Sequence, residues 1–228
     1  MLSDVMEDYL KAVYVLERED GAPVRTSALA EYLGVTPPTV TSMIEKLEER
    51  GLLDREKYKG VELTEEGETV ALEVLRHHRL IESYLAEHLD YEWSEVHEEA
   101  DALEHHISEE FERRVAAALG DPRVDPHGDP IPTEDLAPLA DDDTVALASV
   151  SEGDTVVVAR VSDRDDDHLD YLAARGVEPG ARLDVVDIAP IDLITVRVDD
   201  RDVHLPTSIA SAIRVRAPED ADADEVPA

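Results

Sequence analysis

The spacing of hydrophobic residues changes once along the chain. Up to about residue 119, hydrophobic residues recur at the three- or four-residue spacing of one face of an α-helix. From about residue 155 they alternate with polar residues, as expected of strands with one buried face. Between these parts, residues 120–143 are rich in Pro and Asp, including DPHGDPIP, and predict a loop or linker. The pattern therefore predicts an α-helical part, a connecting segment and a β part.

The N-terminal part predicts the element order of a winged helix-turn-helix. The first predicted helix covers residues 4–16 and is ended by Gly21-Ala22-Pro23, and the second covers 27–33, with Thr26 as its N-cap and Gly34 as its stop. The third begins at Thr36-Pro37-Pro38 and ends at Gly51. A charged hairpin over 54–64 and a long helix over 64–89 follow. The third of these helices is the predicted recognition helix.

The remaining pattern predicts one more helix and a small β-barrel of about 70 residues. The helix is predicted over residues 93–119. The predicted strands cover residues 155–161, 182–188, 194–198 and 213–217, with one helix over 168–176. The acidic tail, residues 218–228, has little to bury and is predicted to be disordered.

Composition indicates a folded but very acidic protein. The 228 residues carry a net charge of −35, from 56 acidic and 21 basic residues, while 43% hydrophobic residues favour packed cores. An Asp-rich, Lys-poor surface favours a halophilic cytoplasm, and an ordinary acidic protein is the alternative. The chain has no cysteine, which excludes disulfides and thiolate ligands. No apolar run is long enough for a membrane span and no signal peptide is evident, so we expect a cytoplasmic protein.

Residues 24–60 lack the excess of acidic residues found in the rest of the chain. Between Val24 and Gly60, six basic residues balance six acidic ones, as phosphate contact would require. The start of the predicted recognition helix offers short polar side chains to base edges, while Val40, Ile44 and Leu47 form its buried stripe. The predicted DNA contacts are Arg25, Thr36, Pro38, Thr39, Ser42, Lys46, Arg55, Lys57 and Lys59. A helix-turn-helix used only for packing is the alternative.

Histidines and acids gather downstream of this motif. His97, Asp101, Glu104 and His105 have the spacing of one helix face, and His78 and Glu82 form another i, i+4 pair. Imidazole and carboxylate together suit Mn²⁺, Fe²⁺ or Zn²⁺. Ion pairing with Arg76, Arg79 or Arg113 is the alternative explanation. His77, His88 and His106 lie off these faces and are predicted to be surface residues.

Several stretches together resemble the diphtheria-toxin-repressor and manganese-transport-regulator family of metal-activated repressors. They are MEDYLKAVYVL, GVTPPTVTSMIEKLEERGLL, LTEEGETVALEVLRHHRLIESYL, VHEEADALEHHISEEFERRV and DPHGDPIP. The stretch LDYLAARGVEPGARLDVV is similar to the SH3-like domain of this family and to the FeoA proteins of ferrous-iron transport. The resemblance covers nearly the whole chain.

The resemblance implies two metal sites. The primary site takes one ligand from the first helix and three from the dimerisation helix, which fall on Asp8, Asp101, Glu104 and His105. The ancillary ligands fall on His78, Glu82, His97, Asp165 and His168, although DRDDDHLD permits more than one register for the last two.

Two departures bear on the choice of metal. Iron-type members have Met and Cys where this chain has Asp8 and Asp101, whereas manganese-type members have carboxylates at both positions. Lys11, however, replaces an acidic residue that manganese-type members use, which argues against a closely coupled two-metal site.

The resemblance thus implies a multidomain α+β repressor. We expect a winged helix-turn-helix over residues 1–72, an all-α metal-binding and dimerisation domain over 73–142, an SH3-like barrel over 143–217 and the tail. A homodimer would bind a palindromic operator, with Mn²⁺ or Fe²⁺ as corepressor, and would control metal-uptake genes.

Three alternatives remain open. The first is an iron-specific regulator. The second is a metal hydrolase with Glu98 or Glu109 as base, although the sequence has no HExxH motif, nucleophile elbow or phosphate-binding loop. The third is a helix-turn-helix scaffold that senses no metal.

Overall fold

The computed structural model describes residues 2–56, 59–140 and 143–218. Contacts divide the chain into two compact units. The first consists of residues 1–81, 100–123 and 131–139, and the second of residues 82–99, 124–130 and 140–228. The predicted tail, apart from residue 218, lies outside the described residues.

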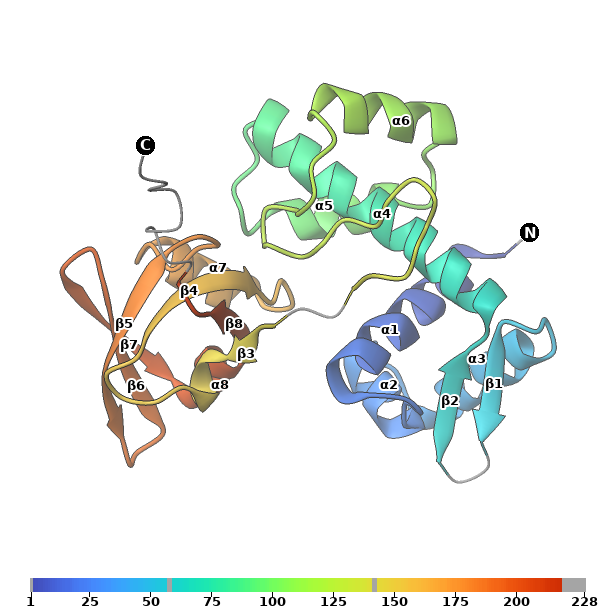
Figure 1. Cartoon of the computed structure of the whole chain (residues 1–228). Helices are drawn as coiled ribbons and strands as arrows, with labels where there is room; N and C mark the ends of the chain where they lie inside the picture. The colour runs from blue at the N-terminus through green and yellow to red at the C-terminus, as the bar shows by residue number, and fades with distance from the viewer. Residues whose placement is uncertain (1, 57–58, 141–142, 219–228) are drawn as a thin grey trace, which may run out of the picture. The chain divides into compact units, whose positions relative to one another are not determined.

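The first unit contains the predicted winged helix-turn-helix (Figure 1). Its elements are α1 (Asp4–Asp20), α2 (Thr26–Tyr32), α3 (Pro37–Glu48), β1 (Leu53–Glu56) and β2 (Gly60–Leu63). The two strands pair antiparallel. The three helices and the hairpin share one core, in which Leu10, Leu29 and Ile44 are among the fully buried side chains. Because α1 and α3 contribute to the same core, a displacement of α1 is transmitted to α3.

The ends of the short helices follow local sequence signals. Thr36 is the N-cap of α3 and Pro37 fills the first helical position, where proline needs no hydrogen-bond donor. Gly51 adopts a φ of +74° after the helix, a conformation that favours glycine. The N-cap of α2 was predicted wrongly, because Arg25 is the cap and Thr26 is already helical.

The helical region after the hairpin differs from the prediction. Helix α4 (Glu65–His88) is continuous, but the predicted helix over 93–119 is two helices, α5 (Val96–Leu103) and α6 (Glu109–Ala118). Ser108 ends the interruption, because its Oγ accepts a hydrogen bond of 3.3 Å from the backbone N of Phe111 as the N-cap of α6. Glu104 therefore lies in a turn rather than on a helix face.

The second unit contains the predicted β domain (Figure 1). A six-stranded antiparallel sheet has the strand order β3-β8-β4-β5-β6-β7. Its elements are β3 (Val145–Ala146), β4 (Thr155–Val161), α7 (Asp166–Ala173), β5 (Arg182–Ala189), β6 (Leu193–Val198), β7 (Arg201–Pro206), α8 (Thr207–Ser211) and β8 (Ile213–Arg216), with a 3-10 turn at Leu147–Ser149. The inward-facing residues of the sheet form a separate core with the buried residues of α7. Strands β3 and β7 were not predicted.

Residues 124–130 of the Pro- and Asp-rich segment form a packed loop rather than a free linker. Within the second unit, the backbone O of His127 accepts a hydrogen bond of 2.9 Å from the N of Val161 on β4. Gly128 has a φ of +91°, and a Cβ there would lie 2.1 Å from the carbonyl oxygen of Ala159. Trp93 Nε1 donates a 2.9 Å hydrogen bond to the carbonyl oxygen of Pro126. The loop is thus held directly against the sheet.

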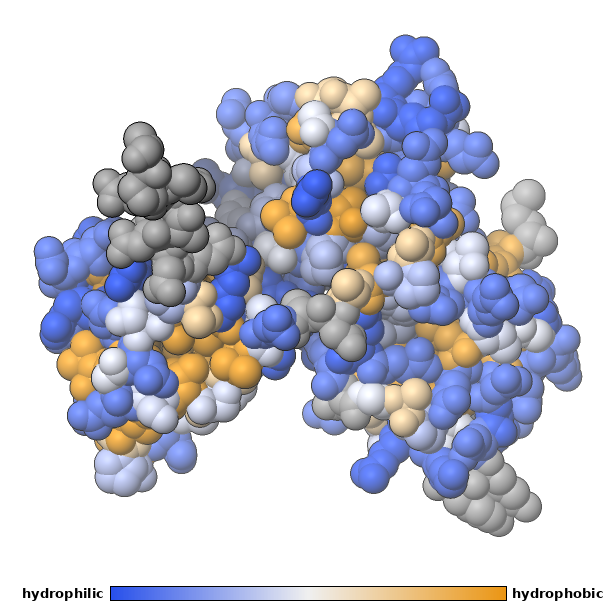
Figure 2. Space-filling view, viewed as in Figure 1, coloured by the Kyte–Doolittle hydropathy of each residue, from blue (hydrophilic) through white to orange (hydrophobic). Residues whose placement is uncertain are grey.

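The surface agrees with the composition. Figure 2 shows mostly hydrophilic residues on the face in view. In the part of the chain that the structure describes, no helix is both long and apolar enough to cross a membrane.

Candidate metal centre

Three residues of the first unit bring potential metal ligands together, and we name them the first cluster: Asp8, Glu104 and His105. Asp8 is on α1, whereas the other two follow the end of α5. His105 Nε2 lies 2.8 Å from Asp8 Oδ1 and 3.3 Å from Glu104 Oε1. Glu104 is only 1% exposed. The turn after α5 therefore directs both of its ligand groups toward the first helix.

A buried ammonium group stands beside this cluster. Lys11 Nζ lies 2.6 and 2.8 Å from the two oxygens of Glu104 and 2.9 Å from Asp101 Oδ1. On the same side, His78 Nδ1 lies 2.6 Å from Glu104 Oε2 and 3.3 Å from Asp101 Oδ1. His78, Asp101 and Glu104 could hold a cation, and Lys11 already contacts two of them.

The charges of these groups shift their pKa values. Burial alone would raise the pKa of Glu104, but the hydrogen bond from His78 and the charge of Lys11 lower it. Burial alone would lower the pKa of Lys11, but Glu104 and Asp101 raise it. Burial raises the pKa of Asp8, although the neighbouring His105 opposes this. Glu104 is therefore held as a carboxylate, which is the form that binds a metal ion.

A second group of ligands lies in the second unit. Glu82 is on α4, His97 is on α5, and Asp163 follows β4. His97 Nδ1 lies 3.3 Å from Glu82 Oε1 and 3.3 Å from Asp163 Oδ2. Burial alone would raise the pKa of Asp163, but the hydrogen bond and charge of His97 lower it to about 2.

Asp125 and His127 of the packed loop complete this group. Their ligand atoms lie near those of Glu82, and all three side chains are buried. His127 Nδ1 is 3.8 Å from Glu82 Oε1, while its Nε2 is 3.0 Å from the carbonyl oxygen of Trp93. Burial alone would lower the pKa of His127, but Glu82, Asp125 and Asp163 raise it to about 9. The second cluster is accordingly Glu82, His97, Asp125, His127 and Asp163.

Both clusters fit a divalent transition metal. Each offers carboxylate oxygens and imidazole nitrogen, the ligand set that Mn²⁺ and Fe²⁺ accept. In the second cluster, His127 Nδ1 is buried without a hydrogen-bond partner among the described residues, although burying such an atom costs free energy. A bound cation would give this nitrogen a partner.

The ligands predicted from the sequence fall only partly into these two clusters. Among the described residues, His97 shares no ligand group with Asp101, Glu104 or His105; the break after Leu103 takes Glu104 and His105 off the helix face, although His97 and Asp101 both lie on α5. Asp165 is instead the N-cap of α7 and accepts a 3.0 Å hydrogen bond from the N of His168. Asp163 stands in the cluster where Asp165 or His168 was expected.

Of the three histidines predicted at the surface, His88 and His106 are exposed but His77 is buried. Its Nδ1 is 3.0 Å from the carbonyl oxygen of Glu104, and its Nε2 is 3.4 Å from Glu112. Glu112 also accepts a 2.5 Å hydrogen bond from Arg76. His77 thus supports the turn that carries Glu104. Arg76 and Arg113 pair with α6 acids rather than with the predicted ligands.

The predicted DNA-contacting residues are accessible in the first unit. Exposed residues among them are Arg25, Thr36, Pro38, Thr39, Ser42, Lys46, Arg55 and Lys59. Val40, Ile44 and Leu47 are buried on the opposite side of α3, as predicted. The hydroxyl groups of Thr36 and Thr39 form a 2.8 Å hydrogen bond. Lys57 lies outside the described residues.

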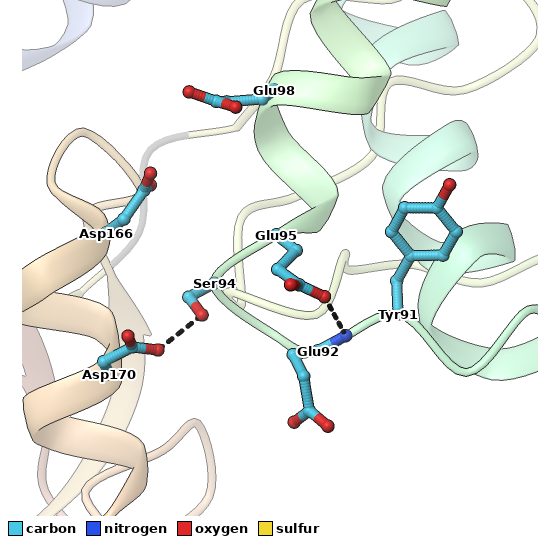
Figure 3. Close-up of a pocket in the computed structure, with 7 residues that line it drawn as sticks. All are labelled: Tyr91, Glu92, Ser94, Glu95, Glu98, Asp166 and Asp170. Atoms are coloured by element: carbon cyan, nitrogen blue, oxygen red, sulfur yellow. Dashed lines mark hydrogen bonds between the residues drawn. The ribbon is translucent and has the colours of Figure 1, made fainter.

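The second unit also has an acidic hollow, shown in Figure 3. Its lining residues are Tyr91, Glu92, Ser94, Glu95, Glu98, Asp166 and Asp170. Ser94 Oγ donates a 2.5 Å hydrogen bond to Asp170, and Glu98 extends toward the same hollow. None of these lining residues is histidine.

Comparisons with known protein families match three successive parts of the chain. Residues 1–61 match "Iron dependent repressor, N-terminal DNA binding domain". Residues 64–133 match "Iron dependent repressor, metal binding and dimerisation domain". Residues 145–217 match "FeoA domain".

Individual relatives match almost the full length. The iron-dependent repressor IdeR of Mycobacterium tuberculosis is 36% identical over 226 residues, covering 94% of this chain and 97% of that repressor. The diphtheria toxin repressor of Corynebacterium diphtheriae is 30% identical, with the same coverage of both chains. A solved structure of a manganese-dependent transcriptional repressor in complex with manganese is 37% identical, covers 93% of this chain and 100% of its own, and superposes with a TM-score of 0.85.

Proposed function

The chain belongs to the iron-dependent repressor family, and on this premise we propose that a divalent metal ion bound at the first cluster activates it for operator binding. As a member of that family it is a metal-dependent, DNA-binding transcriptional repressor and not an enzyme. The proposal rests on the observation that Asp8 of α1 lies against Glu104 and His105 of the metal-binding and dimerisation domain. A metal bound by all three would join the two domains.

The consequence for DNA binding follows from the packing of the first unit. α1 shares a core with α2, α3 and the hairpin, so fixing Asp8 restricts the whole winged helix-turn-helix. In a homodimer, this restriction would set the spacing of two recognition helices on a palindromic operator. A ligand shifts such an equilibrium only if it binds the DNA-competent form more tightly.

Within the first cluster, we propose Asp8, Glu104 and His105 as the ligands of the activating ion, with Asp101 as a further carboxylate on the side of Lys11. A metal there would supply positive charge to the two carboxylates and would serve to hold them together, not to catalyse a reaction. The oxygen-rich ligand set favours Mn²⁺ relative to softer sites, and Fe²⁺ is the second candidate.

We propose the second cluster as an ancillary metal site. Asp163 replaces the predicted Asp165 and His168 as the ligand from the barrel domain, and His127 and Asp125 are added. His78, which is one helical turn before Glu82 on α4, was also predicted here, and it stays a candidate ligand although its Nδ1 contacts Glu104 in the first unit. A metal in this cluster would hold the packed loop, α5 and the end of β4 together within the second unit.

The DNA contacts are proposed to divide between reading and anchoring. Thr36, Pro38, Thr39 and Ser42, which are exposed, are proposed to meet base edges and thymine methyl groups. The basic side chains are proposed to meet phosphates: Arg25, Lys46, Arg55, Lys57 and Lys59. We further propose that the repressor controls metal-uptake genes. We also propose a salt-rich cytoplasm as its setting, since the charge of −35 keeps such a protein hydrated.

An operator-binding titration tests this function. A duplex recovered by selection from a random library with Mn²⁺ present would be titrated with full-length protein in Mn²⁺, anaerobic Fe²⁺, Co²⁺, Zn²⁺ or chelator. We expect Mn²⁺ to raise affinity by about 5- to 150-fold, the usual range of allosteric coupling, and Zn²⁺ to bind but activate poorly. Equal binding with and without metal would support a scaffold that senses no metal. Activation by Fe²⁺ but not by saturating Mn²⁺ would establish an iron-specific regulator.

A further inference from the structure

His105 is held at both of its ring nitrogens in the first unit. Nε2 lies 2.8 Å from Asp8 Oδ1, and Nδ1 lies 2.8 Å from Glu7 Oε2. The His105 side chain is only 7% exposed, so water competes little for either nitrogen. Glu7 and Asp8 are consecutive on α1, and successive helical side chains point about 100° apart, which lets the two carboxylates reach opposite edges of one ring.

The two edges of the ring are not equivalent. The Nε2 edge faces Asp8 and Glu104, with which His105 forms a group able to hold a metal ion. The Nδ1 edge faces Glu7, which belongs to none of the metal-binding groups found among the described residues. A neutral imidazole binds metal through one nitrogen and carries its proton on the other. Metal binding at the first cluster therefore requires the proton to stay on the Glu7 side.

We infer that Glu7 is a positioning residue that holds His105 with Nδ1 protonated and Nε2 directed at the metal position. This inference rests on the proposed function. The need for such a residue arises from the site itself, because Asp8 and Glu104 both attract a proton to Nε2. A proton kept there would block coordination. A carboxylate hydrogen-bonded to Nδ1–H favours the other tautomer and makes Nε2 a stronger donor.

The inference predicts a difference between two substitutions of Glu7. Glu7→Leu removes the acceptor, whereas Glu7→Gln keeps a carbonyl oxygen that can accept from Nδ1–H. Asp4→Leu is the matched control, since Asp4 is an exposed acid in the same first turn of α1 and removal of its charge should leave His105 untouched.

The experiment measures Mn²⁺ affinity of the full-length variants by calorimetry, with thermal unfolding of the metal-free proteins as a check on folding. We expect Glu7→Leu to lose about 10- to 100-fold in the affinity of the activating site, the usual effect of removing an outer-shell partner. Glu7→Gln should recover most of that loss, and Asp4→Leu should match wild type. In ¹⁵N-histidine NMR of the Zn²⁺-loaded wild type, His105 should carry its proton on Nδ1.

The outcomes separate this inference from the proposed function. Wild-type affinity in Glu7→Leu, or coordination of Zn²⁺ through Nδ1 of His105, would overturn the role of Glu7 and leave the proposed function standing. An equal loss in Glu7→Gln and Glu7→Leu would also overturn it, since an acceptor for Nδ1–H would then not be what matters. A wild-type protein that binds no Mn²⁺ would overturn both.

Discussion

The two clusters offer similar ligands but neutralise their carboxylates differently. In the first cluster, the ammonium of Lys11 lies within 2.9 Å of Glu104 and Asp101 and remains charged at any physiological pH. In the second cluster, the cationic partners are His97 and His127, which can lose their protons. The comparison teaches that the first cluster carries a permanent counter-charge, whereas the charge of the two imidazoles in the second cluster changes with pH.

The largest expected effect comes from removing the permanent counter-charge. Lys11→Met keeps the length of the side chain but leaves Glu104 buried without its ammonium partner, which should destabilise the metal-free protein by about 3–5 kcal/mol. Denaturant unfolding with and without Mn²⁺ measures this. Mn²⁺ should restore part of the loss, because the ion replaces the missing positive charge. A variant as stable as wild type without metal would show that Lys11 is not the counter-charge.

A substitution in the packed loop would test the second cluster separately from the first. Gly128→Ala places a Cβ 2.1 Å from the carbonyl oxygen of Ala159 and strains a φ of +91°, so we expect a loss of about 1–3 kcal/mol. The displaced loop should weaken metal binding through His127 and leave the first cluster unchanged. Calorimetric titration with Mn²⁺ would resolve the two sites. Gly120→Ala is the control, since it also has positive φ but meets no atom within 4 Å.

Loss of one ligand from each cluster should affect different properties. Asp8→Asn should remove most of the stimulation of operator affinity by Mn²⁺, which is about 5- to 150-fold or about 1–3 kcal/mol. His97→Asn should lower the number of ions bound per chain while most of the activation remains. Anisotropy on the selected duplex and metal analysis after dialysis measure these effects. If His97→Asn lost activation as completely as Asp8→Asn, the assignment of roles to the two clusters would be wrong.

The last expected effect is a pH dependence of the second cluster. The pKa of His127 is raised from 6.5 to about 9, so its contribution to stability is complete below pH 6.5 and is lost as pH rises through 9. The metal-free protein should lose at most about 3 kcal/mol over this range. Metal affinity should rise over the same range, because the metal displaces the proton. A His127→Gln variant should flatten both profiles; unchanged profiles would contradict the assignment.

The sequence predicted those parts of the fold whose signals are local. Helix α3 begins at Thr36-Pro37 and its apolar stripe is buried, because capping and periodicity act within one helix. The break between α5 and α6 was missed, although Ser108 is a standard N-cap residue, because the helical periodicity continues across it. Strand β7 was missed because two charged residues begin it and a proline ends it, which leaves only Val203 and Leu205 as its buried apolar positions. Local sequence signals do not decide whether a capping residue such as Ser108 begins a new helix or lies within a longer one.

Candidate ligands were predicted less completely than the fold, for a related reason. Asp8, Glu104 and His105 were placed together by resemblance, and their convergence depends on a turn that no helical spacing contains. Asp163 and His127 were missed because they lie in loops, where spacing carries no geometric information. Glu7 was missed because an acid in the first helical turn has an ordinary explanation as a partner of the helix dipole. Only tertiary contacts distinguish these roles.

The most direct test of the central claim is to locate the metal ion. Crystals of the full-length protein grown with Mn²⁺ and the selected operator should give an anomalous scattering peak within coordinating distance of Asp8, Glu104 and His105. The position of this peak would show that the activating ion joins α1 to the turn after α5. An operator complex that requires Mn²⁺ but has its only anomalous peak at the second cluster would contradict the account.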